Sequence, residues 1–168
     1  METRPTPNDH RLVLFHEDVE RMDRVLEEFI GLSGAKAVVL VDRSGRVITR
    51  RGEELRVDMD TIGALAAGSF AATREMARVL GEERFNCLTH QGTRNHLHLA
   101  LIGDRTLLTA LFDERTTLGM VRFYAGQCTR RLASLFEEMR NRSNPPGEAL
   151  DAGFGSSASR LLDEVLRG

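Results

Sequence analysis

The sequence predicts an α+β fold, an α/β sandwich in which a five-stranded antiparallel sheet carries helices on both faces. Three long segments have apolar residues three or four positions apart, as amphipathic helices do, and five short runs are rich in β-branched and other apolar residues, as strands are. The strands come as one pair and one group of three with a helix between the groups, so we expect antiparallel neighbours within each group. The predicted order is α-ββ-α-βββ-α.

The chain has 168 residues, enough for one domain with an ordinary hydrophobic core and a short tail. The composition divides it into a polar, flexible N-terminus at residues 1–11, a domain at 12–141, a linker at 142–158 and a short amphipathic helix at 159–168. The linker is rich in proline and small residues, which is typical of a connection between folded parts.

Charge and hydropathy exclude several classes of protein. A formal net charge of -2 offers no general attraction for nucleic acid or an anionic membrane, and no stretch approaches the roughly 20 apolar residues of a membrane span. The N-terminus lacks the apolar run of a signal peptide, and the two cysteines, Cys87 and Cys128, have no metal-binding spacing. We therefore predict a cytoplasmic protein with two reduced thiols.

The first part of the domain is predicted to be a helix followed by a hairpin. Leu12 to Ile30 is predicted to be a helix with apolar residues on one side and charged residues on the opposite side, and Gly31 or Gly34 is expected to end it. The run at Lys36–Val41 indicates a strand buried on both faces, and a turn sequence, DRSG, leads to a second strand at Arg46–Arg50. The residues predicted to face the core from the helix are Phe15, Val19, Met22, Leu26 and Phe29.

The central element is one long helix from Asp58 to Gly81, with Asp58 or Asp60 capping its first turn and Gly81 closing its last. Because glycine inside a helix costs roughly 0.5–1 kcal/mol relative to alanine, Gly63 and Gly68 require a compensating contact. That contact is either with the chain's own sheet or with a helix of another protein or of a second copy. The stripe predicted to face the core is Ile62, Leu65, Ser69, Ala72, Met76 and Val79, and the small residues four apart are Gly63, Ala67 and Ala71, and Ala64, Gly68 and Ala72.

A second hairpin follows, with strands predicted at Phe85–Gln91 and Asn95–Ile102. A three-residue loop between them places Phe85 and Cys87 on the face of the sheet that carries the leucines of the second strand, whereas a loop of two or four residues reverses this. The three-residue loop is favoured because it places the apolar residues of both strands on one face of the sheet.

The domain is predicted to end with one more strand and a helix. Thr106–Phe112 is a continuous apolar strand. Thr116 or Thr117 is expected to cap the last helix, which runs to about Asn141.

Few residues indicate chemistry of the chain's own. With the three-residue loop, His90, His96 and His98 share a face, which can hold zinc or copper; the alternative is an ordinary polar face of a hairpin. No glycine-rich phosphate loop or catalytic triad is present, so we predict no cofactor, no metal and no active site. Three arginines on predicted loops are either arginine fingers for a GTPase or solvated surface residues: Arg43, Arg94 and Arg115.

This order of elements, with the sequence LAAGSFAA at its centre, resembles the roadblock family of GTPase-associated modules, and within it the bacterial MglB group. The resemblance covers Val13 to Arg140, most of the chain. It rests on an ordered set of segments: Ala37–Gly45, Leu65–Ala72, Leu80–Glu82, His90–Gly92 and Phe112–Val121.

The resemblance implies a homodimer that binds an MglA-like Ras-family GTPase in its GTP form, in cell polarity and gliding motility. MglB-like members stimulate GTP hydrolysis without an arginine finger, because the dimer aligns the catalytic residues of the GTPase itself. A roadblock scaffold or sensor module that binds proteins without activating a GTPase is the alternative. A small-molecule sensor of the profilin-like or PAS-like kind is a third reading, which the strands, filled with valine, leucine and alanine, do not favour.

The resemblance also implies where the contacts lie. The edge strand would pair across a two-fold axis through Phe85, Cys87 and Thr89. Arg74 and Glu75 depart from the small residues expected there, and are candidates for ion-pair selectivity. The GTPase and dimer interface would comprise Gly63, Ala64, Ala67, Gly68, Ala71, Arg74 and Glu75, and the tail that contacts the GTPase and is linked to nucleotide exchange would use Leu161, Leu162, Val165 and Leu166.

Overall fold

The computed structural model describes residues 14–54 and 56–143. These residues fall into two compact units. One, Phe15–Leu135, holds the whole sheet and most of the helical residues. The other includes Leu14 and the last turns of the final helix, from Phe136 to Ser143.

The predicted order α-ββ-α-βββ-α is confirmed, and the five strands form one antiparallel sheet in the order β2-β1-β5-β4-β3. Each strand pairs with its neighbour in the sheet, so β2 and β3 are the two edges. The elements are α1 (His16–Ser33), β1 (Ala37–Asp42), β2 (Val47–Gly52), α2 (Met59–Leu80), β3 (Cys87–Gln91), β4 (His96–Ile102), β5 (Thr106–Phe112) and α3 (Leu118–Ser143).

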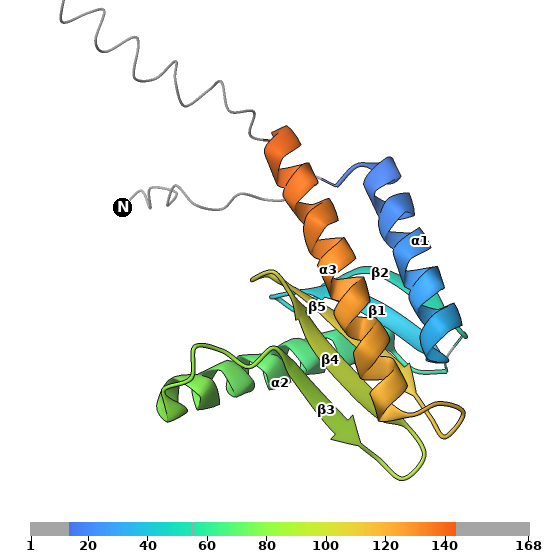
Figure 1. The fold of residues 1–168 in the computed structure, drawn as a ribbon, viewed down its shortest axis with the longest axis vertical. Coiled ribbons are helices and arrows are strands. Elements are labelled where there is room, and N and C mark those ends of the chain that lie inside the picture. Colours follow the sequence, from blue (N-terminus) through green and yellow to red (C-terminus); the bar gives the residue numbers. More distant parts are fainter. Residues whose placement is uncertain (1–13, 55, 144–168) are drawn as a thin grey trace, which may run out of the picture. The chain divides into compact units, whose positions relative to one another are not determined.

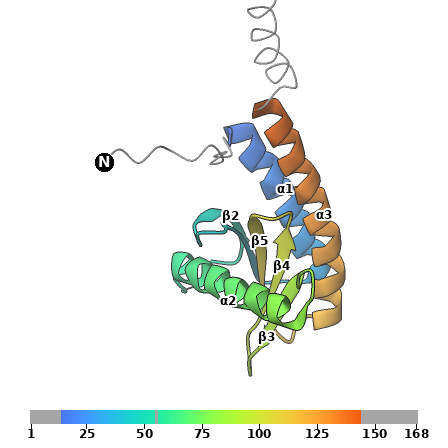
Figure 2. The same ribbon diagram turned by 90° about the vertical axis from the view of Figure 1, so that its left-hand side faces the viewer.

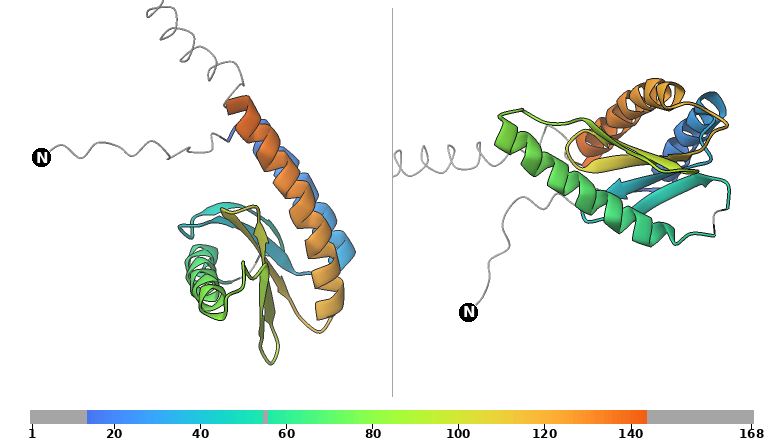
Figure 3. Two further views of the ribbon diagram at one scale, coloured as in Figure 1. Left: turned by 60° about the vertical axis from the view of Figure 1, so that its left-hand side comes forward. Right: turned by 90° about the horizontal axis from the view of Figure 1, so that it is seen from below.

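The helices lie on opposite faces of the sheet, as predicted. Helix α2 crosses one face, whereas α1 and the first part of α3 lie side by side on the other (Figures 1 and 2). The view from below in Figure 3 separates the three layers and shows that the C-terminal end of α2 projects beyond β3. This projection positions the candidate site.

Successive side chains of the central strands point to opposite faces of the sheet, so each face contributes to its own part of the hydrophobic core. On the α2 side, one cluster joins Phe70 of the helix to Leu99 and Leu107 of the sheet, and another joins Met59 to the valines of β1. Strands β1 and β5 are buried along almost their whole length, as expected for strands that are covered on both faces.

Helix α1 begins at His16, four residues after the predicted Leu12, because Phe15 has an extended conformation (φ -89°, ψ 162°) and acts as the N-cap. Phe15 was predicted to face the core but is 54% exposed. The carboxylate of Asp23 anchors the helix to β2: it accepts a hydrogen bond of 2.6 Å from the Thr49 hydroxyl and pairs with the guanidinium of Arg51.

The helix caps follow the local sequence. Asp58 caps α2 by accepting the backbone N–H groups of Asp60 and Thr61, and Gly81 ends the helix in the left-handed conformation. Gly34 does the same for α1. At the start of α3, the Thr117 hydroxyl accepts the N–H of Met120 at 3.2 Å.

The predicted three-residue loop between β3 and β4 is wrong. Gln91 pairs with His96, which leaves four residues in the loop, and Cys87 pairs with Ala100 on the face away from α2. Leu88, rather than Cys87, packs with the leucines of β4, and Phe85, which precedes the strand, lines a pocket with Leu101. The four-residue loop shifts the pairing of β3 with β4 by one residue relative to the prediction. Because side chains alternate between the two faces along a strand, this shift moves every paired side chain of β3 to the face opposite the predicted one.

The core-facing stripe predicted for α2 is also wrong. Leu65 is 62% exposed, Met76 53% and Val79 77%. The face that packs on the sheet carries mostly small residues, with one methionine and one aromatic ring: Met59, Gly63, Ala66, Ala67, Phe70, Thr73 and Ala77.

Candidate functional site

The outward surface of α2 is the largest set of exposed apolar side chains on one element of the described chain. Leu65, Met76 and Val79 point away from the sheet, and Leu80, 70% exposed, adds to them at the end that projects beyond β3. Single exposed apolar residues are common, but a group on one helix marks an interaction surface. This surface is the first part of the candidate site.

The small residues of α2 divide between two environments. A Cβ on Gly63 would lie 3.0 Å from the carbonyl oxygen of Gly45 and within 3.3 Å of two valine methyl groups, so this glycine packs on the chain's own sheet. Ala67 is buried with it. A Cβ on Gly68 would meet nothing within 4 Å among residues 14–54 and 56–143. The small residues therefore serve the chain's own sheet on one face of the helix and remain open to another chain on the other face. Gly63 and Ala67 face the sheet. The exposed residues are Ala64, Gly68, Ala71, Arg74 and Glu75.

Strand β3 is the second part of the candidate site. It pairs only with β4 in the described chain, so its outer backbone groups have no strand partner. Cys87 and Thr89 are half-buried within it, and Phe85, predicted to belong to the strand, is half-buried in the segment that precedes it. An unpaired strand edge is a template for pairing with another chain.

A groove of about 560 Å³ opens between the start of α2 and the β3–β4 hairpin. At its base lies the hydroxyl of Thr109, which is 2% exposed and has no hydrogen-bond partner in the described chain. The lining is mostly apolar, and it could not be found from the sequence because its residues come from segments that are far apart in the chain. The groove is lined by Lys36, Val57, Met59, Ile62, His90, Gln91, Gly92, Asn95, Leu97, Thr109 and Leu111.

A smaller pocket of about 270 Å³ lies on the other flank of α2. Four arginines surround it: Arg43, Arg74, Arg84 and Arg105. Of these, only Arg43 and Arg74 are site candidates on sequence grounds, because Arg84 and Arg105 come close to them only in the folded chain.

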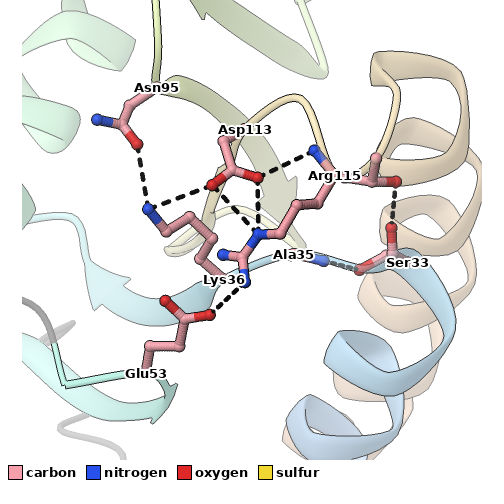
Figure 4. Close-up of polar contacts among 8 residues, drawn as sticks. Ser33, Ala35, Lys36, Glu53, Asn95, Asp113 and Arg115 are labelled. Carbon is pink, nitrogen blue, oxygen red and sulfur yellow. Dashed lines mark hydrogen bonds and ion pairs between the residues drawn. The ribbon is translucent and has the colours of Figure 1, made fainter.

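Arg115, a candidate arginine finger, is held in an ionic network at the surface of the protomer (Figure 4). Its guanidinium binds Glu53 at 2.8 Å and Asp113 at 3.0 Å, and Lys36 reaches Asp113 at 3.3 Å. The hydrogen bonds from Arg115 lower the pKa of Asp113 to about 2, and those to Glu53 and Asp113 raise the pKa of Arg115. The network ties the end of β5 to β1 and β2.

The three histidines of the hairpin do not share a face. His90 pairs with Leu97 on the α2 side, whereas His96 and His98 lie on the opposite side. His98 is buried, and its Nδ1 lies 2.9 Å from the Thr89 hydroxyl. Burial lowers the pKa of His98 to about 4, with a contribution from Arg122.

No group of three metal-ligating side chains occurs within residues 14–54 and 56–143. Over the same ranges, no helix has the length and apolar character needed to cross a membrane. The predicted tail residues Leu161, Leu162, Val165 and Leu166 lie outside the described residues.

Residues 21–112 match the model of the Roadblock/LC7 domain family. No curated protein sequence matches. Among solved structures, one described as MglB with a tetrameric arrangement is 36% identical, with a TM-score of 0.73, and covers 77% of this chain and 97% of its own.

Two further solved structures are similar. The gliding protein MglB of Thermus thermophilus is 37% identical with a TM-score of 0.72, covering 76% of this chain and 97% of its own. Myxococcus xanthus MglB is 31% identical with a TM-score of 0.67, covering 70% and 96%. Profilin II of Acanthamoeba castellanii, 12% identical with a TM-score of 0.52 over 67% of this chain and 97% of its own, shares the fold alone.

Proposed function

The chain belongs to the Roadblock/LC7 family, and from this premise we propose that it is a homodimer that binds an MglA-like Ras-family GTPase and stimulates its GTP hydrolysis. It acts on the GTP form, supplies no arginine finger, and serves cell polarity or gliding motility. It has no active site of its own. The observation that carries the proposal is an exposed apolar α2 surface directly beside an unpaired sheet edge.

The homodimer is supported by the complementarity of two surfaces. If two copies of β3 pair antiparallel about a two-fold axis perpendicular to the sheet, the projecting end of each α2 comes to lie over the β3–β4 hairpin of the other copy. The groove beside that hairpin is lined by apolar groups such as Val57 and Leu97, and the projecting end carries Met76, Val79 and Leu80. Each copy would thus bury the apolar residues of the other.

The GTPase seat is supported by the outward face of α2. Gly68 costs helix stability and makes no compensating contact with the described residues, which fits the close approach of another backbone. Leu65 and Ala64 flank it on the exposed side. Two such faces, side by side in a dimer, form one extended surface for a single partner.

The proposal is tested by single-turnover GTP hydrolysis of an MglA-type GTPase from the same organism, with and without this protein, and by the molar mass of the complex. We expect acceleration of at least about 10-fold, and a complex in which two copies of this chain bind the GTPase. Binding without acceleration would favour the scaffold alternative. Absence of binding to either nucleotide form would reject both.

A further inference from the structure

The arginine-rimmed pocket on the flank of α2 is assembled from four separate segments. Arg43 lies in the β1–β2 turn, Arg74 in the C-terminal half of α2, Arg84 in the segment before β3, and Arg105 in the β4–β5 turn. All four residues are exposed at the surface. The fold therefore gathers their positive charges around one opening of about 270 Å³.

The positive charge of this pocket is poorly compensated. Asp104 is the one acidic residue in the lining, and it pairs with Arg84 at 3.3 Å. In the described part of the chain, Arg43, Arg74 and Arg105 form no ion pair. Such a cluster is attractive to anions, because planar guanidinium groups bind carboxylates through two parallel hydrogen bonds.

Below the arginines, the pocket is apolar. Phe70 and Leu107 are 3% and 4% exposed, and Phe85 and Leu101 are half-buried. An inorganic anion alone would leave this lining without a partner. The combination fits an apolar side chain that is flanked by carboxylates.

Resting on the proposed function, we propose that this pocket receives an acidic segment of the GTPase, in which an apolar side chain enters the pocket and neighbouring carboxylates pair with Arg43, Arg74 and Arg105. The pocket shares Ala71 and Arg74 with the exposed α2 surface and is continuous with it, so a partner seated on α2 covers both. Complementary charges at the rim of an interface raise the association rate and exclude wrong partners. The pocket thus selects GTPases that carry this segment.

The test is a charge reversal with a matched control. Arg43→Glu/Arg105→Glu alters two exposed residues on turns, and neither arginine has an ion pair to lose within the described chain. Arg24→Glu/Arg130→Glu makes the same change of charge on α1 and α3, which cover the opposite face of the sheet. Affinity for the GTPase loaded with a non-hydrolysable GTP analogue is measured by isothermal titration at low salt, about 50 mM NaCl, and at about 300 mM, where charges are more strongly screened. Folding is followed by circular dichroism.

We expect the pocket variant to lose about 10- to 100-fold in affinity at low salt and the control less than about 3-fold. Raising the salt should weaken binding of the wild-type protein more than binding of the pocket variant. Unchanged affinity in the pocket variant, with wild-type binding intact, overturns the inference and leaves the proposed function standing. Absence of wild-type binding rejects both.

A second measurement separates a small-anion site from a protein contact. Pyrophosphate is titrated into the wild-type protein and the pocket variant while the melting temperature is followed. If pyrophosphate stabilises only the wild-type protein and does not compete with the GTPase, the pocket is a free-anion site and the inference is wrong. Competition with the GTPase supports it.

Discussion

The backbone of Gly45, in the β1–β2 turn, lies directly against the backbone of Ala64 in α2: a Cβ on Gly45 would come within 2.7 Å of the Ala64 Cα. Gly45 also has a φ of 87°, a conformation that residues with a side chain rarely adopt. The contact fixes the distance of α2 from the sheet. It also places Ala64 with its backbone inward and its methyl group toward solvent.

Replacing Gly45 by alanine should therefore destabilise the fold. We expect Gly45→Ala to lower the free energy of unfolding by about 1–3 kcal/mol, because strain in φ adds to the clash with α2. Chemical denaturation followed by circular dichroism measures this. Gly68→Ala is the control: its Cβ meets open space, so it should raise stability by about 0.5–1 kcal/mol. Equal stability of the two variants would contradict the packing described.

The projecting end of α2 should be required for dimerisation. Val79 is 77% exposed in the protomer, so Val79→Asp should leave the protomer folded while weakening the dimer at least about 10-fold, because it places a charge in an apolar groove. Sedimentation equilibrium measures the dissociation constant. Phe123→Asp removes another exposed apolar side chain, 62% exposed, from α3 and should leave the dimer intact. A dimer of wild-type affinity in Val79→Asp would argue against the proposed arrangement.

The exposed glycine of α2 should be required for GTPase binding. Gly68→Leu fills space that is open in the protomer, so the fold should persist while a partner backbone is excluded. We expect the affinity for the GTP-bound GTPase to fall at least about 10-fold. Gly126→Leu makes the same substitution within α3, where a Cβ would meet only the end of the Arg130 side chain. Loss of binding in both variants would point to a general effect of the substitution.

His98 should make stability depend on pH. Its pKa is about 4 in the folded protein, against 6.5 for an unperturbed histidine. Between these values the unfolded chain binds more protons than the folded one, so stability should fall as pH decreases from 6.5 to 4. His98→Asn keeps a polar group near Thr89 but does not titrate, and its melting temperature should change less over this window. Equal slopes in the wild-type protein and in His98→Asn would refute this role of His98.

Much of the fold could be predicted because it depends on neighbours in the sequence. Caps such as Asp58 and Gly81, and turns such as Asp42–Gly45, involve residues a few positions apart. In that turn, one Asp42 oxygen accepts the N–H groups of Ser44 and Arg46. The order of helices and strands follows from the same local periodicities, so the roadblock architecture was within reach of the sequence.

The face that α2 turns to the sheet could not be predicted in this way. Two stripes on the helix are apolar, one with Leu65, Met76 and Val79 and the other with Gly63 and Ala67. Hydrophobicity favours the larger residues for the core. The structure buries the stripe with Gly63 and Ala67, because the close approach of the Gly45 turn leaves no room for a large side chain at position 63.

The sequence by itself therefore determined the elements, their order, their caps and the family that they indicate, since these depend on local interactions and on an ordered set of short segments. The tertiary structure alone decided which stripe of α2 is buried, the parity of the β3–β4 hairpin and the gathering of Arg43, Arg84 and Arg105 around one pocket. Each of these depends on contacts between residues far apart in the chain, whose spacing no local pattern encodes.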